Sequence, residues 1–215
     1  MPMKRLDFSE TFRVEVGPER VSFDVHKGIV CERAPFFHIA RSPHWIRAGQ
    51  PVKLHDDQPE VFQAYLTLVY TGKVENNPES AGYPYLGLMK LFILADTLQD
   101  LAAANQAMDE ILAIPSKMNC YPNKSAIRLA YRETVAGGPI QRVIAHLYVH
   151  GPNKLPTSRE LMGLPHEFLA DVVKEFMSLK NQYPNNTVKQ VFSQSISLDD
   201  ACTYHLHDAE HPKCA

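Results

Sequence analysis

The sequence predicts an α+β fold, in which a short, mostly antiparallel sheet flanked by a helical cluster is followed by an α-helical extension. Two observations predict it: apolar residues alternate with polar ones near the start of the 215-residue chain, and they recur at helical spacing from residue 61 onward. Hydrophobic residues make up 45% and charged residues 21%, as in an ordinary globular protein. A chain of this length can bury a core of its own.

Three strands are expected in the first part of the chain. Residues 11–16 and 21–25 both alternate between apolar and polar side chains, as half-buried strands do. Between them, residues 17–20 read Gly-Pro-Glu-Arg, which favours a turn, so the pair is predicted to form an antiparallel hairpin. A third, short strand is expected at residues 52–55, and the two aspartates at 56–57 are expected to cap the helix that follows.

The rest of the chain is predicted to be largely helical. Apolar residues recur at helical spacing in six segments, which are residues 59–72, 86–98, 101–114, 125–131, 140–148 and 165–179. Gly72 and Pro115 are expected to end the first and third of these helices, and Ser125 is expected to cap the fourth. No internal repeat is present, which argues against a solenoid.

Charge and composition exclude several classes of partner. The formal net charge is -2, with 22 basic and 24 acidic side chains interspersed, so neither nucleic acid nor a membrane is an expected partner. Residues 1–10 carry charges and no apolar run, unlike a signal peptide. We therefore expect a cytoplasmic and/or nuclear protein, whose four cysteines are core thiols or metal ligands rather than disulfides.

Several motifs in the first part of the chain match one known family. Residues 23–30 combine a strand ending in histidine with the start of a short helix, and the pair Phe36-Phe37 follows. The helix over residues 59–72 opens with Pro-Glu-Val-Phe and closes with Tyr-Thr-Gly, and the strand at residues 52–54 precedes it. In this order the motifs resemble a BTB/POZ domain. The resemblance implies a BTB/POZ domain over residues 1–118, with the fold that the periodicity predicts.

The following segments resemble the helical extension of fungal members of this family. They are residues 131–134, 140–142 and 164–169. The resemblance implies a helical C-terminal extension over residues 119–200, ahead of a tail at residues 201–215. One departure concerns self-association: many members carry an aspartate ahead of the first strand, where this chain has Thr11-Phe12.

The resemblance implies a non-catalytic protein-protein interaction module. Such a module holds a second copy of itself as a homodimer, or acts as an adaptor for a cullin-type ubiquitin ligase. One alternative is a transcription-associated regulator, and another is an enzyme whose site is assembled from distant residues, with His26, Glu60 or His150 as candidates. Trp45 is interpreted as a core residue that could also anchor a partner.

The histidines have simpler interpretations. His146 and His150 share a helix face at i, i+4, but Leu147 stands where a metalloprotease helix carries its glutamate, so we interpret them as a core or surface pair. His26 is expected to hydrogen-bond local backbone. No cofactor is required by any motif.

The tail concentrates soft metal ligands. Cys202, His205, His207 and Cys214 supply two thiolates and two imidazoles, which is the ligand set of a closed, structural zinc site. His211 could replace His207 as the fourth ligand. The alternative is an ordinary flexible end.

Overall fold

The computed structural model describes residues 7–42, 50–74, 84–150, 157–182, 198–208 and 214. They fall into two compact units, called unit 1 (within residues 1–77 and 90–107) and unit 2 (within residues 78–89 and 108–215). Trp45 and His211 lie outside the described residues. The expected domain boundaries at residues 118 and 200 stay predictions.

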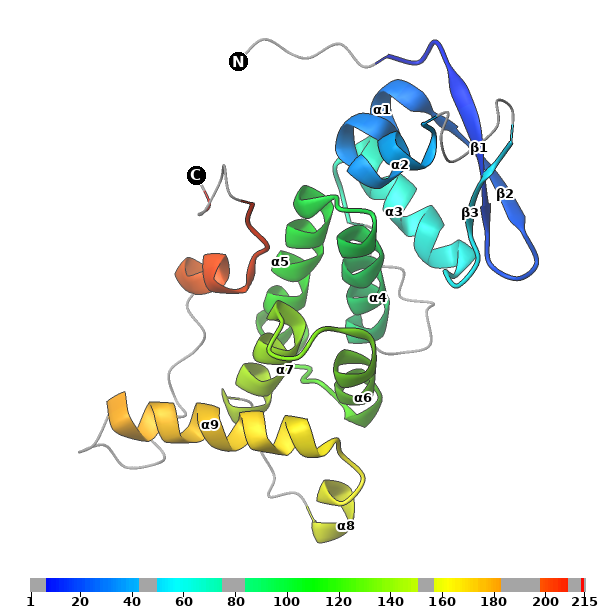
Figure 1. Cartoon of the computed structure of the whole chain (residues 1–215). Coiled ribbons are helices and arrows are strands. Elements are labelled where there is room, and N and C mark those ends of the chain that lie inside the picture. Colours follow the sequence, from blue (N-terminus) through cyan, green and yellow to red (C-terminus); the bar gives the residue numbers. More distant parts are fainter. Residues whose placement is uncertain are drawn as a thin grey trace. The chain divides into compact units, whose positions relative to one another are not determined.

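Unit 1 contains a three-stranded mixed sheet in the order β2-β1-β3 (Figure 1). The strands are β1 (Thr11–Val16), β2 (Val21–His26) and β3 (Val52–Leu54). The first two form the predicted antiparallel hairpin, whereas β3 runs parallel to β1. Val14 stands opposite Phe23 on one side and Val52 on the other. The prediction of strands is confirmed, and one of the two strand pairs is antiparallel.

The hairpin turn depends on Gly17, which has a positive φ of 76°. A Cβ at this position would lie 3.3 Å from the carbonyl oxygen of Asp57 and 3.3 Å from the ring of Pro59. Its N–H donates to the carbonyl of Leu54 at 2.8 Å. Glycine is therefore needed both for the left-handed backbone and for the close approach of the next segment.

Five helices follow the hairpin in the described part of the chain up to residue 118. They are α1 (Lys27–Arg33), α2 (Pro35–Ala40), α3 (Pro59–Thr71), α4 (Pro84–Thr97) and α5 (Leu101–Met118). The core of unit 1 is aromatic, since Phe37, Phe62 and Tyr65 are fully buried. Gly72 ends α3 in the left-handed conformation, as predicted.

Asp100 is the one charged residue that is buried in the described part of the chain, with 1% of its surface exposed. Its carboxylate accepts two N–H groups of the Arg33 guanidinium at 3.1 and 3.3 Å, the hydroxyl of Tyr65 at 3.1 Å and the backbone N–H of Ala103 at 2.9 Å. It thereby caps the first turn of α5. Burial, followed by the charge of Asp100, raises the pKa of Tyr65 above its ordinary value.

Two predictions about helix ends in the first part of the chain are wrong. The aspartates at 56–57 do not cap α3; Gln58 occupies the N-cap position, and no side chain bonds there. Pro115 does not end α5, which continues to Met118. Proline inside a helix removes one hydrogen bond, at a cost of about 3 kcal/mol. The buried residues Ile111, Leu112 and Ile114 precede the proline, whereas Met118 after it is 59% exposed. The Pro115 carbonyl still accepts the N–H of Asn119 at 2.9 Å.

The described elements after residue 118 are helical. They are α6 (Lys124–Glu133), α7 (Pro139–His150), α8 (Ser158–Leu161), α9 (His166–Gln182) and the 3-10 helix η1 (Leu198–Tyr204). In unit 2, α9 packs against α6 and α7, as Figure 1 shows. Phe168 of α9 is fully buried there against the rings of Tyr131 and Tyr148.

The cap of α6 differs from the prediction. Asn123 is the N-cap, and its side chain accepts the backbone N–H of Ala126 at 3.0 Å. Ser125 lies within the helix, because the helix begins two residues earlier than expected.

Among the described helices, none has the length and apolar character needed to cross a bilayer.

Candidate functional site

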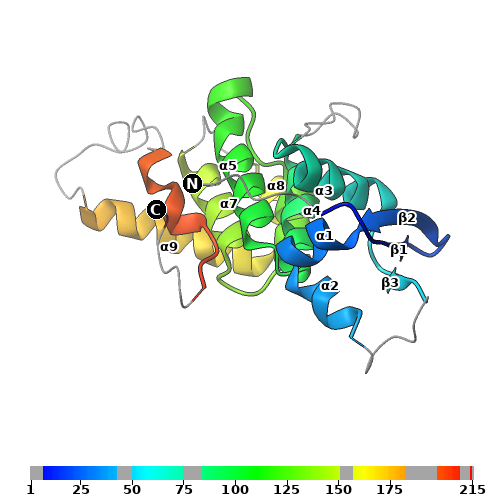
Figure 2. The same cartoon turned by 90° about the horizontal axis from the view of Figure 1, so that it is seen from above.

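The 3-10 helix η1 packs against α7 within unit 2. Tyr204 is buried with 8% of its surface exposed, and its ring lies edge-on to His146 of α7 at 5.8 Å. The guanidinium of Arg142, also on α7, donates to the carbonyl of Thr203 at 3.0 Å. Figure 2 shows η1, in orange-red, within this helical part of the chain. The packing fixes the position of Cys202, which precedes these residues in η1.

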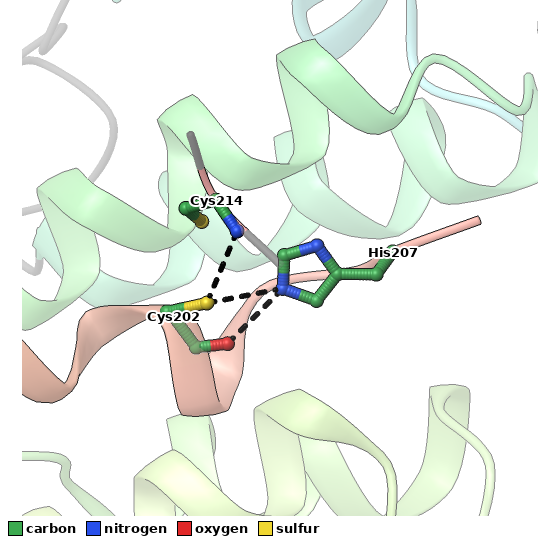
Figure 3. Close-up of side chains that lie close together, drawn as sticks. All are labelled: Cys202, His207 and Cys214. Atoms are coloured by element: carbon green, nitrogen blue, oxygen red, sulfur yellow. Dashed lines mark hydrogen bonds between the residues drawn. The ribbon is translucent and has the colours of Figure 1, made fainter. Parts of the chain in front are cut away.

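Three of the four predicted zinc ligands lie together. Cys202, His207 and Cys214 each offer one ligand atom, and these three atoms lie within 4.8 Å of one another (Figure 3). The Sγ atom of Cys202 is 3.4 Å from Nε2 of His207 and accepts the backbone N–H of Cys214 at 3.3 Å. Zinc bonds of about 2.3 Å to sulfur and about 2.0 Å to nitrogen place tetrahedral ligand atoms about 3.5 Å apart. The Cys202–His207 pair already has this separation.

The fourth predicted ligand, His205, contacts Cys214 and Asp109. Its Nδ1 is 3.0 Å from Sγ of Cys214, and its Nε2 is 2.8 Å from Oδ1 of Asp109 on α5. It does not share the group formed by Cys202, His207 and Cys214. A carboxylate on one ring nitrogen is the usual support of a histidine whose other nitrogen binds metal. Because Asp109 precedes His205 by 96 residues, the local pattern that revealed the other residues could not reveal it.

The two thiols have different proton affinities. The backbone N–H of Cys214, followed by its side chain and by His207, holds the pKa of Cys202 below its ordinary value. Burial, followed by the neighbouring Cys202, raises the pKa of Cys214. The Cys202 thiol therefore gives up its proton more readily than the Cys214 thiol. A bound zinc ion would stabilise both thiolates and release the remaining proton.

The three residues considered as catalytic candidates, His26, Glu60 and His150, each have different neighbours. The ring of His26 contacts Phe8 and Tyr70, and Nδ1 is 3.0 Å from the Tyr70 hydroxyl. This hydroxyl also accepts the backbone N–H of His26, so the histidine bonds a side chain rather than the backbone that was expected. Glu60 is exposed on the first turn of α3. His150 faces Glu175 of α9 at 3.9 Å.

One partner of the α7 histidines escaped prediction. Nδ1 of His146 is 2.8 Å from Oε1 of Glu175, and the rings of His146 and His150 stack at 4.1 Å. Glu175 lies 29 residues beyond His146, on a helix whose packing the sequence pattern does not specify. Of the two interpretations, a core or a surface pair, the structure agrees with the first, since the side chains of both histidines are mostly buried.

Comparison with known proteins identifies the first half of the chain. The family model for the BTB/POZ domain matches residues 10–112, which run from the residue before β1 into α5. Comparison with curated proteins finds no match. The matched segment holds the mixed sheet, the helices α1 to α4 and the partly buried Arg33–Asp100 pair. Residues 10–112 of this chain are a BTB/POZ domain, which is a protein-interaction module with an α+β fold.

Proposed function

We propose that this chain is a non-catalytic adaptor, which self-associates through its BTB/POZ domain and contacts a client protein through the helices that follow. The observation that carries the proposal is the family match over residues 10–112, because BTB/POZ domains mediate protein-protein interaction and dimerisation. Binding of a cullin-type ubiquitin ligase scaffold is the other form of the same adaptor role.

The surface of unit 1 supports self-association. Within the described residues, β2 pairs with β1 alone and so forms one edge of the sheet. An edge strand presents unpaired N–H and C=O groups that can pair with another chain. Apolar side chains are also exposed on this unit, since Phe8, Val21 and Ile39 expose 55%, 40% and 53% of their surfaces. A two-fold symmetric dimer would bring two such strands and their apolar neighbours together.

Co-purification of two differently tagged full-length copies tests this proposal. We expect the second tag to be recovered with the first. Recovery should fall with Val21→Lys, which places a charge beside the exposed strand edge. The matched control is Met162→Lys, because Met162 is 85% exposed in unit 2. Mass spectrometry of proteins captured from a native extract covers the cullin form. Recovery of neither a second copy nor a cullin would reject both forms of the adaptor.

We also propose that the tail binds one structural zinc ion through Cys202, His205, His207 and Cys214. The support is the proximity of Cys202, His207 and Cys214, together with the Asp109 carboxylate on His205. His205 would complete the tetrahedron by moving toward the other three ligands. The ion would fasten η1 to α5 and α7, which the tail already contacts.

Metal analysis of the reduced, purified chain tests the zinc site. About one equivalent of zinc is expected from a closed tetrahedral site. Cys202→Ala and Cys214→Ala should each lose it, whereas Cys31→Ala and Cys120→Ala should retain it, which makes the latter two matched controls. Zinc that survives both tail substitutions would contradict this ligand set.

A further inference from the structure

A second group of metal-binding side chains lies between α7 and α9 in unit 2. One ring nitrogen of His146, one of His150 and a carboxylate oxygen of Glu175 lie within 4.8 Å of one another. The two histidines occupy successive turns of α7, so their side chains project from the same face. The glutamate reaches them from α9, whose packing against α7 is set by apolar residues such as Phe168.

The surroundings of the three side chains suit a partly enclosed site. Their exposed fractions are 19% for His146, 9% for His150 and 30% for Glu175. Nε2 of His146 is buried and has no hydrogen-bond partner within the described part of the chain. The other ring nitrogen, Nδ1, lies 2.8 Å from the Glu175 carboxylate and is the nitrogen placed to share an ion with it. The hydrogen bond from His146 also holds the pKa of Glu175 below its ordinary value, so the carboxylate is ionised at neutral pH.

The chemistry of the three groups selects a class of metal. Imidazole suits zinc, copper, iron and nickel, whereas magnesium and calcium prefer sites built from oxygen alone. Two histidines and one glutamate are also a donor set of zinc sites that keep one position open. Tetrahedral nitrogen and oxygen ligands stand about 3.4 Å apart, and Nδ1 of His146 and Nε2 of His150 lie 2.8 and 3.9 Å from the same oxygen of Glu175. Small side-chain movements would therefore complete the geometry.

We propose that His146, His150 and Glu175 form a second metal site, which binds a divalent transition-metal ion and links α7 to α9. Among these ions, zinc fits this ligand set best, and cobalt can replace zinc as a spectroscopic probe. The site differs from the tail cluster in having no thiolate ligand and in leaving one position open for water or for a ligand from a partner. In the metal-free chain, the hydrogen bond between His146 and Glu175 holds the same residues together.

A cobalt titration in a chain without tail thiols tests the proposal. The full-length Cys202→Ala/Cys214→Ala variant is titrated with cobalt alone and followed by visible absorption. We expect saturation at about one equivalent, with d–d bands but without the charge-transfer bands that thiolate ligands give. Excess magnesium should not displace the cobalt, because imidazole ligands disfavour it. Cobalt should also raise the thermal unfolding temperature, because it binds only the folded chain.

Substitutions at the site and beside it complete the test. In the same background, His150→Ala and Glu175→Gln should lose saturable cobalt binding and the thermal shift. His166→Ala and Glu167→Gln should keep both, because these exposed residues at the start of α9 lie outside the group. Glu175→Gln keeps the size of the side chain, so this variant is expected to fold. Circular dichroism of each variant checks that it does. Absence of saturable binding in the background variant, or binding that persists in both site variants, would overturn the proposal.

Discussion

Replacement of Asp100 by alanine is expected to destabilise unit 1 strongly. The carboxylate is 1% exposed and accepts four hydrogen bonds, two of them from the guanidinium of Arg33. Removing one partner of a buried ion pair costs about 3–5 kcal/mol, because the other charge stays in the interior without compensation. Loss of the cap on α5 adds about 1 kcal/mol, and the unpaired hydroxyl of Tyr65 adds about 1–3 kcal/mol.

These contributions do not add in full. The Arg33 side chain is 31% exposed, so its guanidinium can turn toward water once the carboxylate is gone. We therefore expect a loss of about 4 kcal/mol in the free energy of unfolding for Asp100→Ala, near the middle of the range for a broken buried pair. Asp100→Asn should cost less, because the amide oxygen can still accept the N–H of Ala103 that bonds Oδ1 of Asp100.

Urea unfolding followed by far-UV circular dichroism measures these free energies. The matched control is Asp24→Ala, which removes an ion pair with Arg13 whose side chains are 64% and 58% exposed. Such an exposed pair contributes at most about 1 kcal/mol, so the control should stay close to the parent chain. A loss below about 1 kcal/mol for Asp100→Ala, or one equal to the control, would refute the reasoning.

Three further predictions concern helix ends and the core of unit 2, and urea unfolding measures each of them. Asn123→Ala should cost about 1 kcal/mol because α6 loses its cap, whereas Ser125→Ala should be nearly neutral; equal effects would contradict the assigned cap. Pro115→Ala should raise the free energy of unfolding by about 2 kcal/mol. It removes the cost of about 3 kcal/mol of a proline inside a helix, but the unfolded chain regains entropy worth about 1 kcal/mol. A destabilised variant would show that α5 needs the proline. Phe168→Ala should cost about 3–5 kcal/mol, and a loss below about 1 kcal/mol would contradict its place in the core.

A last prediction concerns removal of the proposed zinc ion from the tail. A chelator should release η1, detected as faster hydrogen exchange at Tyr204, and should leave the BTB/POZ domain folded, because the apolar core of unit 1 contains no metal ligand of the proposed sites. Unfolding of residues 10–112 on chelation would contradict a local role for the ion.

The elements of the BTB/POZ domain could be predicted because their patterns are local. The alternation of residues 11–16 and 21–25 specified the hairpin, and Gly72 marked the end of α3. The caps were harder, because several polar residues stand close together ahead of a helix and only the backbone decides which one occupies the N-cap. Thus Asn123 rather than Ser125 caps α6. α5 continues through Pro115 to Met118, although the low helix propensity of proline predicts an end there.

In the candidate sites, too, some residues could be predicted from local sequence and others could not. Cys202, His207 and Cys214 are close in sequence, so their crowding predicted that they could meet, and one ligand atom of each lies within 4.8 Å of the others. Asp109 and Glu175 could not be found from sequence, since each reaches its histidine across 96 or 29 residues. Their positions follow from helix packing, which periodicity predicts only as a buried face and not as a choice of neighbour.

The molar mass of the full-length chain in solution tests the central proposal most directly. Sedimentation equilibrium over a range of concentrations should give twice the 24.3 kDa of one chain, and Val21→Lys should shift the mass toward that of one chain while Met162→Lys does not. A mass of 24.3 kDa at every concentration would contradict self-association through the BTB/POZ domain.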